Sequence, residues 1–140
     1  MAFSLTPYIH FVDNAKEALD FYKGIFGGDA EISKFGEYGT PDNDPSHDLI
    51  MHADFKFAGM QLFISDSLPM GGVKQNGENI ELAMHGGQED EATLKKYFDA
   101  LSEGGAIVVP FETAPWGAKF GMLKDKYGVR WMVNIDQPQK

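Results

Sequence analysis

The chain of 140 residues has the length of one domain, and 43% of its residues are apolar, which is enough for a hydrophobic core. Its formal net charge of −9 and the absence of a basic stripe argue against nucleic-acid binding. Without cysteine it has no disulfides, thiolate metal sites or cysteine nucleophiles. The N-terminus does not resemble a signal peptide, and no apolar run approaches the roughly 18 residues of a membrane span. We expect a cytoplasmic globular protein that binds neither membrane nor nucleic acid.

The first half of the sequence predicts a strand, a helix and three more strands. Residues 7–12 form the first strand, and Asp13 or Asn14 can cap the following helix. Gly27-Gly28 ends that helix. Its apolar residues recur at the spacing of one helical face: Ala15, Ala18, Leu19, Tyr22, Ile25 and Phe26. The later strands cover 30–35, 48–57 and 60–65, with an aperiodic loop over 36–47.

The second half repeats this order after a Gly/Pro-rich connector over 67–78. A shift of 76 residues places Ala18 on Leu94 and Gly28 on Gly104. The predicted elements are a strand over 79–84, a helix over 89–103, and strands over 106–111, 119–124 and 129–135. We therefore predict an α+β fold in a single domain spanning 1–140, with one βαβββ module over about 5–66 and another over about 79–136. Each helix would cover one sheet face, which leaves the opposite faces to enclose a shared pocket.

Three segments, in this order, resemble the PhnB-like branch of the vicinal oxygen chelate superfamily: TPYIHFVDNAKEALDFYKGIFGG, IMHADFKFAGMQLFISD and APWGAKFGMLKDKYGVRWMVNI. The superfamily includes glyoxalase I, bleomycin-resistance proteins and extradiol dioxygenases. The resemblance implies a cup-shaped mixed sheet with the helices on its outer face, a homodimer, and a site inside the cup. The branch is often named after a demethylubiquinone methyltransferase, but we see no glycine-rich nucleotide loop after a strand in this sequence.

The resemblance also implies where a metal would bind, because metal-dependent relatives place one His or Glu on each of four strands. Here those positions fall on Pro7, on Gln61 or Phe63, on Asn79 and on Met132. Proline and phenylalanine cannot bind a metal, methionine is a poor ligand for hard divalent ions, and amides are neutral. We therefore expect neither the usual four-ligand metal site nor another cofactor.

His52 and Glu81 are the predicted catalytic residues. His52 alternates with Met51, Ala53 and Phe55, so we expect it to point into the cup as a hydrogen-bond donor or general base. Glu81 also alternates with apolar neighbours and would face the cup, where it would form either an acid/base pair or a two-ligand metal site with His52. The alternative for Glu81 is a solvated or salt-bridged side chain.

Five further residues are predicted to bind the ligand: His10, Gln61, Phe63, Trp116 and Met132. His10 would otherwise lie at the edge of the core. Trp116 lies in a loop, where it either stacks on a ligand or seals a hydrophobic edge. Asp66 is predicted to cap a turn, Asp125 to hold a turn, and Trp131 to lie in the core.

These predictions lead to two hypotheses about function. The first is a protein that binds a small, partly apolar molecule in the cup, either to sequester it or to transform it, so enzymatic activity stays open. The alternative is a metal-assisted lyase, isomerase or dioxygenase that uses an atypical ligand set: His10, His52 and Glu81. Ligand replacement at the family's metal positions favours the first.

Overall fold

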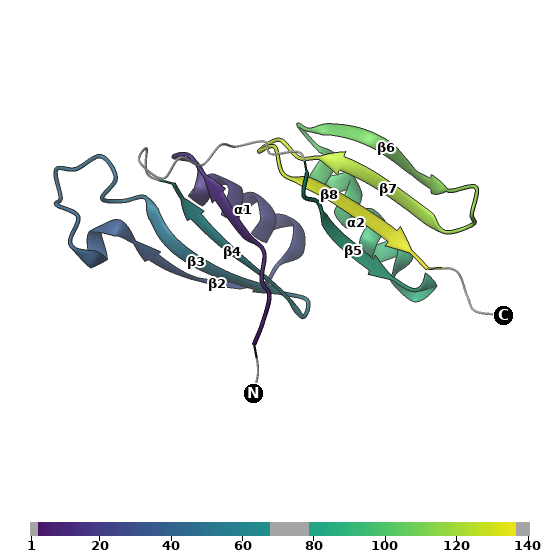
Figure 1. The fold of residues 1–140 in the computed structure, drawn as a ribbon, viewed down its shortest axis with the longest axis horizontal. Coiled ribbons are helices and arrows are strands. Elements are labelled where there is room, and N and C mark those ends of the chain that lie inside the picture. Colours follow the sequence, from purple (N-terminus) through teal and green to yellow (C-terminus); the bar gives the residue numbers. More distant parts are fainter. Residues whose placement is uncertain (1–2, 68–78, 137–140) are drawn as a thin grey trace. The chain divides into compact units, whose positions relative to one another are not determined.

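The computed structural model describes residues 3–67 and 79–136. The chain divides into two compact units, Met1–Gln75 and Asn76–Lys140, which we call module one and module two. Each contains one α-helix, one short 3₁₀ helix and one four-stranded sheet (Figure 1). Most of the predicted connector, residues 68–78, lies outside the described residues. No helix within the described ranges is long and apolar enough to cross a membrane.

Module one contains β1 (Tyr8–Phe11), α1 (Ala15–Phe26), β2 (Asp29–Lys34), the 3₁₀ helix η1 (Phe35–Tyr38), β3 (Ile50–Phe57) and β4 (Met60–Asp66). Its sheet has the order β1-β4-β3-β2. β1 runs parallel to β4, and the other neighbours are antiparallel. The parallel pair is joined through α1, β2 and β3, as a βαβββ module requires.

Module two contains β5 (Leu82–Gly86), the 3₁₀ helix η3 (Gln88–Asp90), α2 (Glu91–Ser102), β6 (Ala106–Thr113), β7 (Lys119–Lys124) and β8 (Arg130–Ile135). Its sheet has the order β5-β8-β7-β6. β5 runs parallel to β8, and the other neighbours are antiparallel. The predicted α+β fold of two βαβββ modules is confirmed. The joint cup and the single domain stay predictions.

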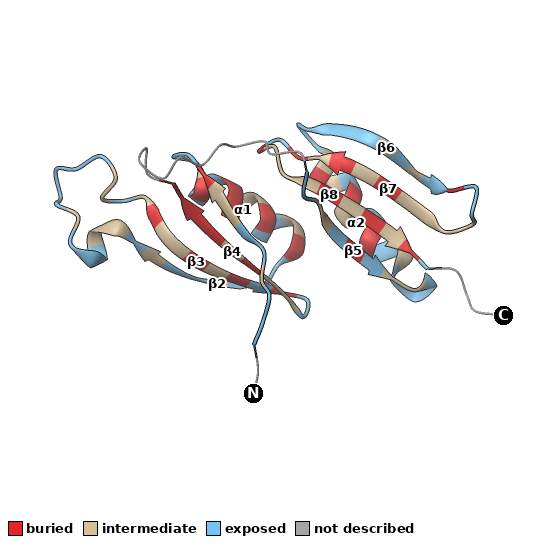
Figure 2. Ribbon diagram, in the orientation of Figure 1, coloured by how far each residue is buried: buried red, intermediate tan, exposed pale blue. Residues whose placement is uncertain are grey.

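Each module has its own core, formed by the apolar face of its helix and one face of its sheet (Figure 2). In module one the core includes Ala15, Ala18, Leu19, Tyr22, Ala53, Phe55, Leu62 and Ile64. In module two it includes Leu94, Phe98, Leu101, Leu123, Trp131 and Val133. The helical residues follow the predicted spacing of three and four. Trp131 is buried in the core, as predicted.

Several predicted boundaries are wrong. The strand predicted over 79–84 is β5, which begins at Leu82, so Glu81 lies just before it. The loop predicted over 36–47 begins inside the 3₁₀ helix η1. The prediction over 89–103 combined η3 with the shorter α2. These errors arise because 3₁₀ turns and strand ends carry too few residues to show a clear period.

The start of α1 is held from a distant part of the chain. Asn14 occupies the N-cap position but makes no side-chain capping hydrogen bond. Instead, the Ala15 backbone N–H donates to Asp66 Oδ1 over 2.9 Å, and the Ile50 N–H donates to Asp66 Oδ2 over 2.9 Å. The prediction that Asp66 caps a turn is therefore wrong: its buried carboxylate connects β4 to α1 and β3.

The structure also corrects the internal alignment after the helices. Asp29 pairs with Lys56 in module one, and Ala106 pairs with Lys124 in module two. A Cβ added to Gly28 would overlap the Lys56 carbonyl oxygen, and a Cβ added to Gly105 would overlap the Lys124 carbonyl oxygen. Gly28 therefore corresponds to Gly105 rather than to Gly104, because module two has one more residue between its helix and the next strand.

Candidate functional site

The sheet of module one has a polar, ring-rich face opposite α1, which we call the open face of module one. Side chains alternate along each strand, so the neighbours of the buried Ala53, Leu62 and Ile64 point to this face. The strand registers bring residues of β1, β3 and β4 together on it. The open face carries Tyr8, His10, His52, Asp54, Gln61, Phe63 and Ser65.

Tyr8 is the centre of a ring cluster on the open face. Its ring stacks on His10 with centroids 4.5 Å apart, and it makes edge contacts with His52 at 5.3 Å and Phe63 at 5.6 Å. His52 and Phe63 also contact each other at 4.9 Å. Tyr8 remains 43% exposed. These four side chains, which we call the Tyr8 cluster, offer flat apolar surface beside two imidazoles.

Both imidazoles of the cluster are oriented through Nδ1. The Tyr8 hydroxyl lies 2.8 Å from His52 Nδ1, and Ser65 Oγ lies 2.9 Å from His10 Nδ1. Ser65 is buried, whereas Tyr8 is not. Hydrogen bonds of this kind fix the ring orientation of a histidine and select one tautomer.

Polar contacts continue along β3 and β4 beside the cluster. Gln61 Nε2 donates to Asp54 Oδ1 over 2.8 Å, and Thr6 Oγ1 donates to Gln61 Oε1 over 3.4 Å. The other Asp54 oxygen lies 3.9 Å from Lys56 Nζ. Gln61 was predicted to touch a ligand, but its amide is engaged at both ends within module one.

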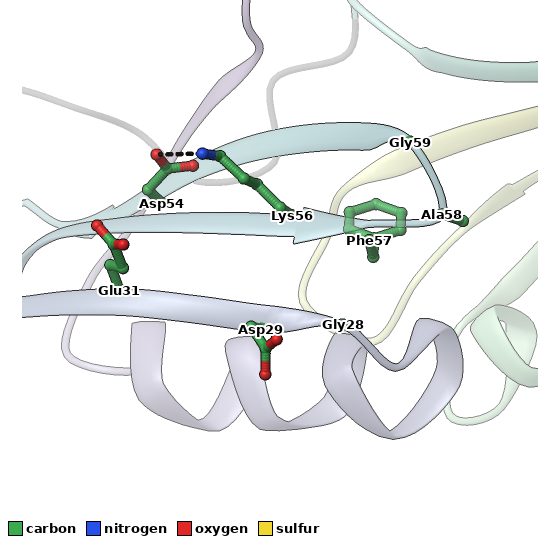
Figure 3. Close-up of a pocket in the computed structure, with 8 residues that line it drawn as sticks. All are labelled: Gly28, Asp29, Glu31, Asp54, Lys56, Phe57, Ala58 and Gly59. Atoms are coloured by element: carbon green, nitrogen blue, oxygen red, sulfur yellow. Dashed lines mark ion pairs between the residues drawn. The ribbon is translucent and has the colours of Figure 1, made fainter.

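A cavity of about 340 Å³ lies farther along the open face, at the end of the β2–β3 pair (Figure 3). Its polar side chains are Asp29, Glu31, Asp54 and Lys56, and its other lining residues come from the Gly28 turn and the β3–β4 turn. None of the predicted site residues lines it.

Module two has a smaller hollow at the corresponding place. It measures about 240 Å³ and is lined by residues that include Gly105, Ala106 and Lys124. These correspond to Gly28, Asp29 and Lys56 of module one. Both hollows form where a helix-ending glycine packs against the carbonyl of a lysine, so they are products of the shared fold.

The remaining predicted residues belong to module two. Glu81 Oε2 lies 3.5 Å from Arg130 Nε, an ion pair in which neither of these two buried atoms has a hydrogen-bond partner within the described chain. Met132 lies on the sheet face opposite α2, because it alternates with the buried Trp131 and Val133 along β8. Trp116 is 66% exposed in the β6–β7 loop, with its ring 5.3 Å from that of Phe120.

The structure thus brings His10, His52 and Phe63 together in module one, and it pairs Glu81 with Arg130. Sequence reasoning missed Tyr8, which contacts all three of the other rings. A signal was present: Tyr8 and His10 are two residues apart on one strand, so they share a face. Among residues 3–67 and 79–136, no three His, Asp or Glu side chains are arranged to hold a metal.

Comparison with known proteins identifies the family. The family model described as 3-demethylubiquinone-9 3-methyltransferase matches residues 4–134. The chain belongs to this family. It is the PhnB-like branch of the vicinal oxygen chelate superfamily, as the resemblance of the three sequence segments predicted.

Relatives match this chain along nearly all of its length. Protein YjdN of Escherichia coli K12 is 31% identical over 96% of this chain and 97% of its own. The crystal structure of protein PA1353 from Pseudomonas aeruginosa is 31% identical, with a TM-score of 0.82, and covers 98% of this chain and 100% of its own.

Two further structures place the fold in its superfamily. A Bacillus cereus PhnB protein, described as a putative 3-demethylubiquinone-9 3-methyltransferase, is 28% identical with a TM-score of 0.73 over 96% of this chain and 100% of its own. A glyoxalase/bleomycin resistance protein/dioxygenase superfamily member from Sphaerobacter thermophilus is 17% identical with a TM-score of 0.56 over 96% and 98%. The latter likeness concerns the fold alone.

Proposed function

We propose that this PhnB-like protein binds a small, partly apolar molecule against the open face of module one. The observation that carries the proposal is the Tyr8 cluster, in which four rings gather on a sheet face opposite the helix. Large aromatic groups on a sheet face that is not packed under the module's own helix are typical of ligand sites. The imidazoles of His10 and His52 add polar groups that can orient the ligand.

The predicted cup, closed within one chain or across a homodimer, and the cytoplasmic location belong to this proposal. In module two, Met132, Trp116 and Glu81 stay predicted site residues. The pairing of Glu81 with Arg130 supports a structural or ligand-orienting carboxylate more than the acid/base pair with His52. Whether the bound molecule reacts stays open.

The side chains at the family's metal positions do not fit a hard divalent ion. Phe63 lies on the open face of β4 and Met132 on the corresponding face of β8, where metal-dependent relatives place His or Glu. Carbon and thioether side chains do not replace oxygen or imidazole ligands of such ions. The proposal therefore contains no step through a metal. Elemental analysis of protein purified without chelator tests this, and a tightly held stoichiometric metal would support the alternative set of His10, His52 and Glu81.

The proposal also contains no methyl transfer. The α-helices of the described chain start after Asn14 and Asp90. Gly86-Gly87 lies between β5 and η3, but no G-x-G-x-x-G pattern follows β1 or β5. The methyltransferase activity in the family's name therefore receives no support from these two helix starts.

Screening metabolites and antibiotics by thermal shift, followed by affinity measurement on the hits, tests the proposed site. We expect His52→Ala and Trp116→Ala each to weaken binding about tenfold, or about 1.4 kcal/mol, because each removes ring surface or a polar anchor. The melting temperature should stay within a few degrees, since neither side chain is in a core.

Lys96→Ala is the matched surface control, because Lys96 is exposed on α2. It should leave both affinity and melting temperature unchanged. Normal binding by both His52→Ala and Trp116→Ala would move the site elsewhere on the molecule.

A further inference from the structure

The hydrogen bonds of His10 and His52 determine which ring nitrogen carries the proton. A neutral imidazole has one N–H donor and one bare nitrogen acceptor. Ser65 is buried, and its only hydrogen-bond partner within the described chain is His10 Nδ1. A buried hydroxyl proton needs an acceptor, so Ser65 donates to a bare Nδ1. The proton of His10 is then on Nε2.

The same argument applies to His52. The phenol of Tyr8 is a better donor than acceptor, because its oxygen lone pair is delocalised into the ring. It therefore donates to His52 Nδ1 across 2.8 Å, which again leaves the proton on Nε2. Neither Nε2 has a hydrogen-bond partner in residues 3–67 or 79–136. The Tyr8 cluster thus carries two imidazole N–H donors for which the described residues provide no acceptor.

The charges around the cluster limit the ligand further. Asp54 follows His52 by two residues on the same face of β3, and Glu31 lies directly opposite Asp54 on β2. Like charges opposite each other on a sheet disfavour additional negative charge. Lys56 Nζ lies 3.9 Å from one Asp54 oxygen and offsets part of this charge, so the three side chains keep a net negative charge. A carboxylate acceptor on the ligand would be disfavoured by that net charge, whereas a neutral carbonyl oxygen would not.

We propose that the open face of module one recognises a neutral aromatic compound that carries a carbonyl-type oxygen. Its ring packs on Tyr8 and Phe63, and its oxygen accepts a hydrogen bond from Nε2–H of His52 or His10. This inference rests on the proposed function and adds to it the chemical class of the ligand. Specificity comes from the donors, because a ligand without an acceptor would leave them unpaired in the contact.

The tautomers are testable without any ligand. In ¹⁵N-labelled protein at about pH 8.5, where histidine is ordinarily neutral, two-bond ¹H–¹⁵N spectra distinguish Nε2–H from Nδ1–H. We expect the Nε2–H form for both His10 and His52. Tyr8→Phe should turn His52 into a mixture of tautomers without changing that of His10, and Ser65→Ala should do the reverse. A dominant Nδ1–H form in either residue would overturn the inference.

The ligand class is tested by titrating the protein with three probes and following backbone amide shifts. Acetophenone has both the ring and the acceptor oxygen, cyclohexyl methyl ketone lacks the aromatic ring, and ethylbenzene, which is also neutral, lacks the oxygen. We expect acetophenone to shift the amides of β1, β3 and β4 and to bind at least fivefold more tightly than the other two. His52→Ala should remove most of that preference.

The outcomes separate the two proposals. If none of the probes shifts amides of the open face, the proposed site itself is wrong. If ethylbenzene binds there as tightly as acetophenone, the site stands and the ligand class is wrong. Binding of the cyclohexyl ketone at the strength of acetophenone would likewise contradict the aromatic part of the inference.

Discussion

The two modules share a backbone plan but differ in the side chains opposite their helices. Matching the strand registers places Tyr8 on Ala83, His52 on Phe120, Asp54 on Met122 and Phe63 on Met132. His10 keeps its residue type, as His85, and so does Lys56, as Lys124. At the positions of Tyr8, His52, Asp54 and Phe63, module one therefore carries polar or aromatic side chains, and module two carries apolar ones. Duplication preserved the fold, and the positions free of core packing diverged.

The modules also differ in how a buried aspartate holds each of them together. In module one, Asp66 at the end of β4 accepts hydrogen bonds from the start of α1 and from β3. The corresponding position in module two is Ile135, a buried apolar residue. There the aspartate is Asp125 in the β7–β8 turn, which accepts from two backbone N–H groups and from Trp131 Nε1 over 2.9 Å. The prediction that Asp125 holds a turn is confirmed.

Replacing Asp66 should have the largest effect and should act on one module. Asp66→Ala removes two hydrogen bonds to a charged acceptor and leaves the Ala15 and Ile50 N–H groups buried without partners. We expect a loss of about 3–5 kcal/mol in the free energy of unfolding of module one. Amide hydrogen exchange should show faster exchange in α1 and β3, with α2 less affected.

Asp136→Ala is the control, because Asp136 follows β8 at the chain position after Ile135, and its exposed carboxylate accepts a hydrogen bond from the Asn134 side chain. It should change unfolding by less than about 0.5 kcal/mol. Equal loss of protection in both helices of Asp66→Ala would show that the modules unfold as one unit, which would remove the basis of this comparison.

The glycines after the helices should behave alike in the two modules. Gly28 has a φ of +82°, and any Cβ there would overlap the Lys56 carbonyl, so Gly28→Ala should cost about 2–4 kcal/mol. Gly105→Ala would overlap the Lys124 carbonyl and should cost about 1–3 kcal/mol, less because its φ is not left-handed. Urea unfolding measures both.

Gly24, in the interior of α1, is the matched control. A Cβ there meets no atom within 4 Å, so Gly24→Ala should stabilise the protein by about 0.5–1 kcal/mol through helix propensity. A neutral Gly105→Ala beside a damaging Gly28→Ala would contradict the alignment of these two glycines.

The features that could be predicted from the sequence follow from local helical and strand periodicity. The features that were missed depend on contacts between residues far apart in the chain. The face of α1, the alternation around His52 and the duplicated order were all readable, because helical and strand periods are local. The role of Asp66 was not, since its partners Ala15 and Ile50 are brought to it only by the folded sheet. The centre of the Tyr8 cluster was missed for the same reason: its contacts with His52 and Phe63 join three strands.

The smallest predicted effect concerns the segment over 39–49, which module two replaces with the short loop over 114–118. Hydrogen bonds from the Ser46 backbone N–H and then from its hydroxyl hold the pKa of Asp44 below its ordinary value of 3.8, with a smaller contribution from His47. Ser46→Ala removes the second of these causes and keeps the first. We therefore expect the pKa of Asp44 to rise while staying below its ordinary value, as followed by carboxyl ¹³C NMR titration.

The sign of the pH effect follows from the same hydrogen bonds. A carboxyl group with a lowered pKa contributes stability above its ordinary value, and that stability is lost as the pH falls through the lowered value. Because Asp44 is fully exposed, the contribution is small, and Ser46→Ala should change the melting temperature at pH 7 by no more than a degree or two. A pKa of Asp44 that stays the same would show that the hydroxyl bond adds nothing in solution. The longer segment of module one would then be organised by its backbone turns and by His47, whose imidazole lies 3.0 Å from carboxylate oxygens of both Asp42 and Asp48.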